Sequence, residues 1–247
     1  GIIKITDKRV KAKHPIGKRM IQVEKNKKPY FNKLLVRETL KQWNLPYYFL
    51  DFETVAPPIP RHNNLRPYQA FPIQFSLHIL KKPGVEPQHF EYLHQGKDDP
   101  RSAIAKALCK WIGLKGDILA FNASFERRFL KELADAVPKY ASKLLAMSER
   151  MVDPQQLFRE AVYYSGFLGS FSLKNVAPTL LGNQFDYSLL DISEGGGVEY
   201  FFNELVQDNI SPRRKKELCC QILEYCRVDT IALVELVNWL VRNARKK

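Results

Sequence analysis

The 247-residue chain lacks any apolar run that approaches the roughly 20 residues needed to cross a membrane. Its first residues also lack the basic and then apolar pattern of a secretion signal. We therefore expect a cytoplasmic protein with no membrane partner, although an export signal could lie outside the given residues.

Cysteine is scarce as well, and the four cysteines form no C-x-x-C pair. Cys219, Cys220 and Cys226 fall on one predicted helix, where the adjacent pair points to different sides. This spacing argues against a zinc site or a disulfide framework. Reduced thiols in a cytosolic core are the better interpretation.

Positive charge is concentrated near the N-terminus. Residues 1–46 hold 13 Lys and Arg against 3 acidic residues, a net charge of +10 out of +13 for the whole chain. Such a segment suits an acidic polymer as partner, or it is a solvated lead-in to further domains outside this chain. We predict a basic N-terminal extension over residues 1–46 and one domain over residues 47–247.

The first strands of that domain are predicted from their apolar patterns. Residues 1–30 indicate an arm with one short hairpin, and residues 31–43 a short helix. The run Tyr47–Glu53 is apolar and ends in carboxylates, which is typical of a strand buried on both faces. Residues 73–79 alternate strictly between apolar and polar, which predicts a half-buried strand, and residues 88–94 predict a third.

Helices dominate the rest of the chain. The pattern predicts a short strand over residues 117–121, helices over residues 124–137, 172–181 and 212–243, and a flexible joint at residues 195–197. This order predicts a mixed α/β domain in which three antiparallel strands precede parallel strands and helices flank the sheet.

Asp51 and Glu53 stand at the end of the first strand. Because side chains alternate along a strand, both carboxylates point the same way and Phe52 points into the opposite layer. Neighbouring anions repel each other and lose hydration, and a divalent cation such as Mg²⁺ or Mn²⁺ removes both costs. The alternative is a pair of strand-end charges without a ligand.

Two later segments place further acids. Glu126 follows Asn122 at a predicted strand-to-helix junction, where an acid is also favoured by the helix N-terminus alone. Tyr225 and Asp229 are four residues apart and share one face of the C-terminal helix. The alternative for that pair is a core tyrosine beside an Asp that pairs with an Arg.

The three elements occur in the order D-x-E, N-x-x-F-[DE], Y-x-x-x-D. In this order the chain resembles the tyrosine variant of the DEDD group of 3′–5′ exonucleases (DEDDy), which has an RNase H-like fold, over residues 47–240. Ser172–Ala177 and Met151–Asp153 are similar to two further segments of that group. A bacterial domain family of unknown function with this exonuclease-like core is more similar still, through Arg66–Gln69, Pro72–His78 and Asn122–Glu126.

The resemblance implies a metal-dependent 3′–5′ exonuclease that hydrolyses phosphodiester bonds of single-stranded DNA or RNA with two Mg²⁺ or Mn²⁺ ions and no small organic cofactor. It implies that Asp51 bridges the ions, that Glu53 and Asp229 complete the shell, and that Glu126 supports the weaker ion. Tyr225 would position the attacking water, since a side-chain pKa near 10 makes it a poor base at neutral pH.

Substrate contacts are expected on the loop after the first motif. Arg66, Tyr68 and Gln69 suit phosphate contact and base stacking, or they belong to a proline-braced loop. Asn122 and Lys174 are further candidates for substrate binding, and the basic extension would add salt-sensitive affinity.

One departure from the exonuclease pattern leaves alternatives open. Where the group has Asp in its second motif, this chain has Glu126. A catalytically weak or inactive module of the same fold, binding nucleic acid or protein, is the main alternative, and an RNase H-like endonuclease is a third. His78, on the polar face of its strand, is expected to be a hydrogen-bonded structural residue.

Overall fold

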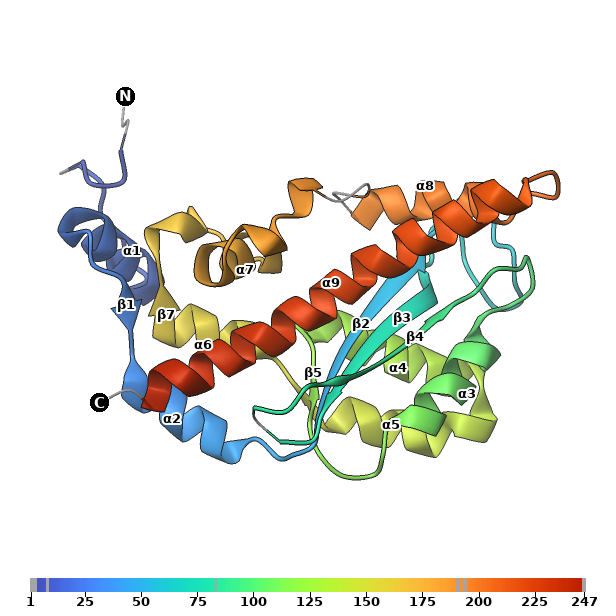
Figure 1. Ribbon diagram of the computed structural model, residues 1–247, viewed down its shortest axis with the longest axis horizontal. Coiled ribbons are helices and arrows are strands. Elements are labelled where there is room, and N and C mark those ends of the chain that lie inside the picture. Colours follow the sequence, from blue (N-terminus) through green and yellow to red (C-terminus); the bar gives the residue numbers. More distant parts are fainter. Residues whose placement is uncertain (1–3, 8, 83, 190–191, 193–194, 246–247) are drawn as a thin grey trace.

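A mixed five-stranded sheet forms the centre of the fold (Figure 1). The structure is a computed structural model that describes residues 4–7, 9–82, 84–189, 192 and 195–245. The spatial strand order is β4-β3-β2-β5-β6. The strands are β2 (Tyr47–Val55), β3 (Phe71–Leu80), β4 (Gln88–Leu93), β5 (Ile118–Leu119) and β6 (Met151–Val152).

The predicted mixed α/β class, with a sheet flanked by helices, is confirmed. Strands β2, β3 and β4 pair antiparallel, whereas β5 and β6 run parallel to β2. Strand β5 pairs with β2, the first strand of the antiparallel group, and not with β4. The order of the strands in space therefore differs from the order in the chain that the sequence analysis predicts. The first strand therefore lies in the middle of the sheet, where neighbours on both sides hold it.

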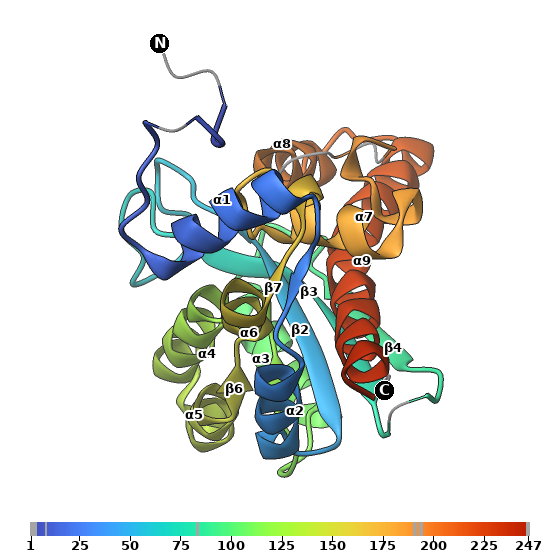
Figure 2. The ribbon, with the colours of Figure 1, turned by 90° about the vertical axis from the view of Figure 1, so that its left-hand side faces the viewer.

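One face of the sheet is apolar and carries three helices. These are α3 (Arg101–Trp111), α4 (Ser124–Ala136) and α5 (Ala141–Glu149). Phe52 points to this side, where its ring meets that of Phe129 edge-on with centroids 6.3 Å apart. Figure 2 shows these helices on one side of the sheet and a long helix on the other.

The opposite face is covered by α9 (Pro212–Arg245), the long C-terminal helix that the sequence predicts. At one end α9 packs on an apolar cluster with Ile73, and at the other on a cluster with Phe49. Between them the sheet presents polar side chains. All ten residues of β3 are buried, so the prediction of a half-buried strand is wrong: its polar face meets a helix, not water.

Residues 23 and 36 of the predicted N-terminal extension pack against later parts of the chain. The predicted hairpin is wrong, because α1 (Pro15–Asn26) is a helix, whereas the short helix after it is confirmed as α2 (Lys33–Gln42). Strand β1 (Tyr30–Phe31) pairs antiparallel with β7 (Val162–Tyr163). Val23 and Val36 lie in one buried cluster with residues of helices α6 (Pro154–Ala161) and α7 (Leu173–Leu181) and of α9.

The predicted flexible joint is also wrong, because the glycines at 195–197 begin helix α8 (Gly195–Leu205). Short 3₁₀ turns complete the described elements: η1 (Pro138–Tyr140), η2 (Ser165–Phe167), η3 (Asn183–Phe185) and η4 (Tyr187–Leu189). No helix in the described part of the chain is both long and apolar enough to cross a membrane.

The contact between α9 and the sheet should carry much of the stability. Leu233 is 2% exposed and packs in the apolar cluster with Phe49. We expect Leu233→Ala to lower the free energy of unfolding by about 2–5 kcal/mol, because it leaves a cavity. Leu145→Ala, at a position that is 42% exposed on α5, should change it by no more than about 0.5 kcal/mol. Chemical denaturation measures both, and equal effects would contradict this account.

Candidate functional site

The D-x-E pair of β2 lies beneath α9. The Cys226 thiol of α9 approaches Asp51 at 3.3 Å from Oδ2 and 3.6 Å from the main-chain oxygen, and it donates to them. Ligand atoms of Asp51, Glu53 and Cys226 all lie within 4.8 Å of one another. The predicted common direction of the two carboxylates is thus confirmed, and a cysteine that the sequence analysis left in the core joins them.

Helix α9 also brings Tyr225 and Asp229 to this point. Asp229 accepts a hydrogen bond on Oδ1 from the hydroxyl of Tyr187, which belongs to the turn η4. The rings of Tyr187 and Tyr225 meet edge-on with centroids 6.4 Å apart. The Lys174 ammonium of α7 lies 5.4 Å from the first ring centroid and 5.5 Å from the second. Tyr187 was not predicted, and Lys174 lies in the site as expected.

Glu126 reaches the same region from the first turn of α4. Its side chain is 3% exposed, and its Oε2 atom has no hydrogen-bond partner among the residues that the structure describes. Burial raises its pKa to about 8, and the charges of Asp153 and Asp229 add to this effect. If this carboxylate were ionised, its buried oxygen would be shielded from solvent and would have no described hydrogen-bond partner.

Burial raises the pKa of all four acids, and neighbouring carboxylates add to the shift in three of them. Burial, then the charges of Asp229, Glu53 and Glu126, raise the pKa of Asp51 well above its usual value. Burial and Asp229 do the same to Glu53, while Lys174 opposes the shift. Burial raises the pKa of Asp229 to about 6, against the hydrogen bond from Tyr187 and the charge of Lys174. The site therefore favours bound protons or a bound cation over four free carboxylates.

The chemistry of these donors fits a hard divalent cation. Ligand oxygens of Asp51 and Glu53 lie within 4.8 Å of each other, and the charges of Glu126 and Asp229 act on Asp51. Mg²⁺ and Mn²⁺ prefer such oxygen ligands. Burial and then the nearby charge of Asp51 raise the pKa of Cys226 well above its usual value, so the thiol stays protonated and acts as a donor to Asp51. Asp51, Glu53, Glu126 and Asp229 are thus the residues that could hold a metal.

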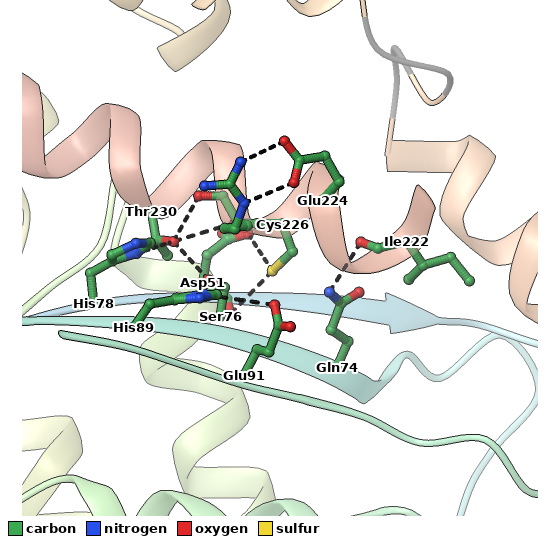
Figure 3. A network of polar contacts seen from close by, with 11 residues as sticks. Asp51, Gln74, Ser76, His78, His89, Glu91, Ile222, Glu224, Cys226 and Thr230 are labelled. Carbon is green, nitrogen blue, oxygen red and sulfur yellow. Dashed lines mark hydrogen bonds and ion pairs between the residues drawn. The ribbon is translucent and has the colours of Figure 1, made fainter. Parts of the chain in front are cut away.

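A second layer of polar contacts lies next to the acids, between the sheet and α9 (Figure 3). The Thr230 hydroxyl lies 2.7 Å from Ser76 Oγ and 2.8 Å from His78 Nδ1. Ser76 Oγ is also 3.0 Å from His89 Nε2, and the rings of His78 and His89 stack with centroids 4.3 Å apart. The prediction of a hydrogen-bonded structural role for His78 is confirmed.

Strand register explains why these polar groups meet. Asp51 pairs with Ser76, which pairs with Glu91 on β4, and side chains of directly paired residues share a face. Two positions along the same strands, Gln74 pairs with Glu53. The Gln74 side chain donates from Nε2 to the carbonyl of Ile222 in α9, 3.1 Å away. Burial, together with the charges of His89 and Arg227, lowers the pKa of His78 to about 3, so the imidazole is neutral near pH 7. The hydrogen bonds of Gln74, Ser76 and His78 thus hold α9 against β3 through neutral side chains.

The remaining candidates form local contacts in their own loops. Gln69 Oε1 accepts from the backbone N–H of Arg66, and the N–H of Gln69 donates back to the Arg66 carbonyl, which closes a turn. Tyr68 is 73% exposed on that turn. Asn122 has a φ of 69°, a region where Asn is favoured, and its side chain accepts from Ser124. The structure gives Asn122 a role in shaping the strand-to-helix junction, and substrate binding by these four residues stays a prediction.

Comparison with known proteins gives one match. A family model described as Domain of unknown function (DUF2779) matches residues 48–172, about half of the chain. No curated protein and no solved structure matches. The matched segment includes Asp51, Glu53 and Glu126, whereas Tyr187 and the two site residues of α9 follow it.

The raised pKa of Glu126 predicts a pH dependence of stability in the presence of a chelator. Its ordinary pKa is 4.5 and its folded value is about 8, so between these the folded state keeps a proton that the unfolded state releases. As pH rises through this window, the unfolding free energy of the wild type should fall relative to that of Glu126→Gln, by at most about 1.4 kcal/mol per pH unit. Denaturation at several pH values measures this. Parallel curves for the two proteins would contradict it, and Glu160→Gln at an exposed position on α6 is the control.

Proposed function

This chain belongs to the DUF2779 family, and we propose that it is a metal-dependent 3′–5′ exonuclease acting on single-stranded nucleic acid. The proposal combines the order of the three acidic motifs with their meeting at one point beneath α9. We also propose that the mixed sheet is an RNase H-like sheet, with the D-x-E motif on its central strand.

The observation that carries the proposal is the Glu126 carboxylate. One of its oxygens is buried without a described partner, close to acids whose pKa values are also raised. Leaving such a group ionised and unpaired is costly. The fold gathers four carboxylates from one strand and two helices, and Lys174 is the nearby cation named above. Bound cations explain this arrangement better than a contribution to structural stability does.

In this proposal Asp51, Glu53, Glu126 and Asp229 hold two Mg²⁺ or Mn²⁺ ions. Bound there, the ions would supply activation of a water and neutralisation of the leaving oxygen. The Tyr187 hydroxyl fixes the orientation of Asp229. The Cys226 thiol, a weak hydrogen-bond donor, does the same for Asp51. A ligand held by a hydrogen bond from behind loses less freedom on binding a metal.

Tyr225 is proposed to orient the attacking water. Burial, then the charges of Asp229 and Glu53, raise its pKa above the usual value for tyrosine. Its hydroxyl therefore stays protonated at neutral pH and serves as a hydrogen-bond donor or acceptor, not as the base. Lys174, close to both tyrosine rings, is suited to attract a phosphate of the substrate.

A binding module without catalysis is the second candidate, and Glu126 favours it. The longer side chain stands where the exonucleases have Asp, and its high pKa without metal leaves it largely protonated near neutral pH. Such a module would bind nucleic acid without cleaving it. It would also show no rise in melting temperature with Mn²⁺.

Cleavage of a 5′-labelled single-stranded oligonucleotide tests the main proposal. With Mn²⁺ or Mg²⁺ we expect products shortened stepwise from the 3′ end and release of 5′ mononucleotides. Asp51→Asn and Asp229→Asn should each reduce cleavage to background, because each removes a proposed metal ligand. Glu132→Gln, an acid further along the helix of Glu126, should keep the activity.

Activity that survives in the Asp51→Asn, Asp229→Asn double variant would sink the proposal. Circular single-stranded DNA should resist cleavage, because an exonuclease needs an end. If the circle is cut and the same variants abolish the cutting, the site is that of an endonuclease.

The hydrogen bond from Tyr187 to Asp229 predicts an effect on metal affinity. Tyr187→Phe removes the hydroxyl but keeps the ring, and we expect it to weaken Mn²⁺ binding by roughly 10–100-fold. The Mn²⁺ concentration that gives half of the rise in melting temperature measures this. Tyr200→Phe, at an exposed position on α8, is the matched control. An unchanged midpoint for Tyr187→Phe would show that this hydroxyl does not support a metal ligand.

A further inference from the structure

A cavity of about 590 Å³ lies at the end of the sheet beside α8, and none of the acids of the candidate site lines it. Its walls come from Arg61 and His62 in the loop after β2, from Phe71 at the start of β3, from residues 94, 96–98 and 100, and from residues 202, 203 and 206–209. This volume falls within the range of about 300–1,000 Å³ that small-molecule sites occupy. The cavity is large enough for a ligand that the proposed exonuclease chemistry does not use.

Aromatic rings form part of the wall. The rings of His62 and Phe71 meet edge-on with centroids 5.2 Å apart, and Phe202 of α8 also lines the cavity. Burial lowers the pKa of His62, which favours its neutral form near pH 7. A wall of uncharged rings suits a flat, unsaturated ligand.

A buried imidazole in the lining offers an unused polar atom. His94 is 7% exposed, and its Nδ1 lies 3.3 Å from the Tyr92 hydroxyl. Its Nε2 has no hydrogen-bond partner among the described residues, although Asp98 Oδ1 lies 3.3 Å away without hydrogen-bond geometry. Gly96 permits this approach, since a Cβ there would lie 2.3 Å from Asp98 Oδ1. Nε2 is therefore a buried polar atom of a lining residue that no described hydrogen bond satisfies.

The rim carries a guanidinium that is bonded to a neutral group. Arg61 donates from Nη2 to Asn203 Oδ1, 2.8 Å away, and no described carboxylate lies within ion-pair distance of it. By contrast, Lys97 on the same rim is paired with Asp208 at 2.6 Å. The charge of Arg61 is therefore available to an anion, and its planar fork matches a phosphate.

We propose that this cavity binds a nucleotide, with the base against the ring wall and the phosphate at Arg61. The side-chain amides of Asn203, Gln207 and Asn209 add both donors and acceptors, as the edge of a base requires. The choice of a nucleotide among flat phosphorylated ligands rests on the proposed function, because the substrate would be a nucleic acid. Phe71 and Phe202 belong to the same apolar cluster as Tyr187 and Tyr225, so that cluster contributes residues to both regions.

Calorimetric titration of adenosine 5′-monophosphate, adenosine and inorganic phosphate into the full chain tests this. The protein carries Asp51→Asn and the buffer contains EDTA, so that neither cleavage nor metal contributes. We expect saturable binding of the nucleotide. Adding Arg61→Gln should weaken it about tenfold while leaving the weaker binding of adenosine unchanged, because only the phosphate contact is lost. Arg213→Gln, at an exposed position outside the lining, should leave both unchanged.

Three outcomes would overturn the inference: no saturable binding of the nucleotide at millimolar concentration, equal weakening by Arg61→Gln and Arg213→Gln, or binding that requires Mn²⁺ and an intact Asp51. Repeating the titration with a short single-stranded oligonucleotide identifies the source. Weakening by Arg61→Gln would place a nucleotide of the strand in the cavity, and its absence would indicate a free nucleotide. Nuclease assays in Mn²⁺ are independent of this result, so a protein that binds the nucleotide through Arg61 but cleaves nothing would refute the proposed function alone.

Discussion

The site depends on how α9 is held across the sheet. Apolar clusters at both ends of the contact, around Phe49 and around Ile73, bring the helix down on a sheet face whose middle rungs are polar. The two apolar clusters determine the position of the helix. The acids, histidines and hydroxyls between the clusters are therefore removed from water, even where their own burial is unfavourable. Burial is the largest cause of the raised pKa of Asp51, Glu53 and Asp229.

Two kinds of polar group share this buried zone, and the structure treats them differently. Ser76, His78 and Thr230 are joined by hydrogen bonds between neutral groups, which is the ordinary solution for buried polar atoms. The neighbouring carboxylates carry charges of the same sign and cannot neutralise one another. One oxygen of Glu126 also has no described partner. A hydrogen-bonded neutral layer beside buried acids with raised pKa values is the kind of arrangement that functional sites show, and it supports the proposed metal site.

Much of this could be predicted from local pattern. Tyr47–Leu50 and the helix of Tyr225 and Asp229 were identified because a buried strand and a long amphipathic helix leave clear periodicities. The alternation of β3 was interpreted wrongly, since alternation reports two different faces but not what covers the polar one. A signal was present: the polar positions hold Gln74, Ser76 and His78, without the Lys and Glu that solvated strand faces commonly carry.

Tyr187 and the cavity beside α8 had no comparable signal. Tyr187 lies in a single 3₁₀ turn far along the chain from the acid that it bonds, and its position follows from packing in the cluster with Phe202 and Tyr225. That cluster also forms part of the cavity wall, so one set of apolar contacts positions a hydroxyl behind Asp229 and shapes a separate space nearby.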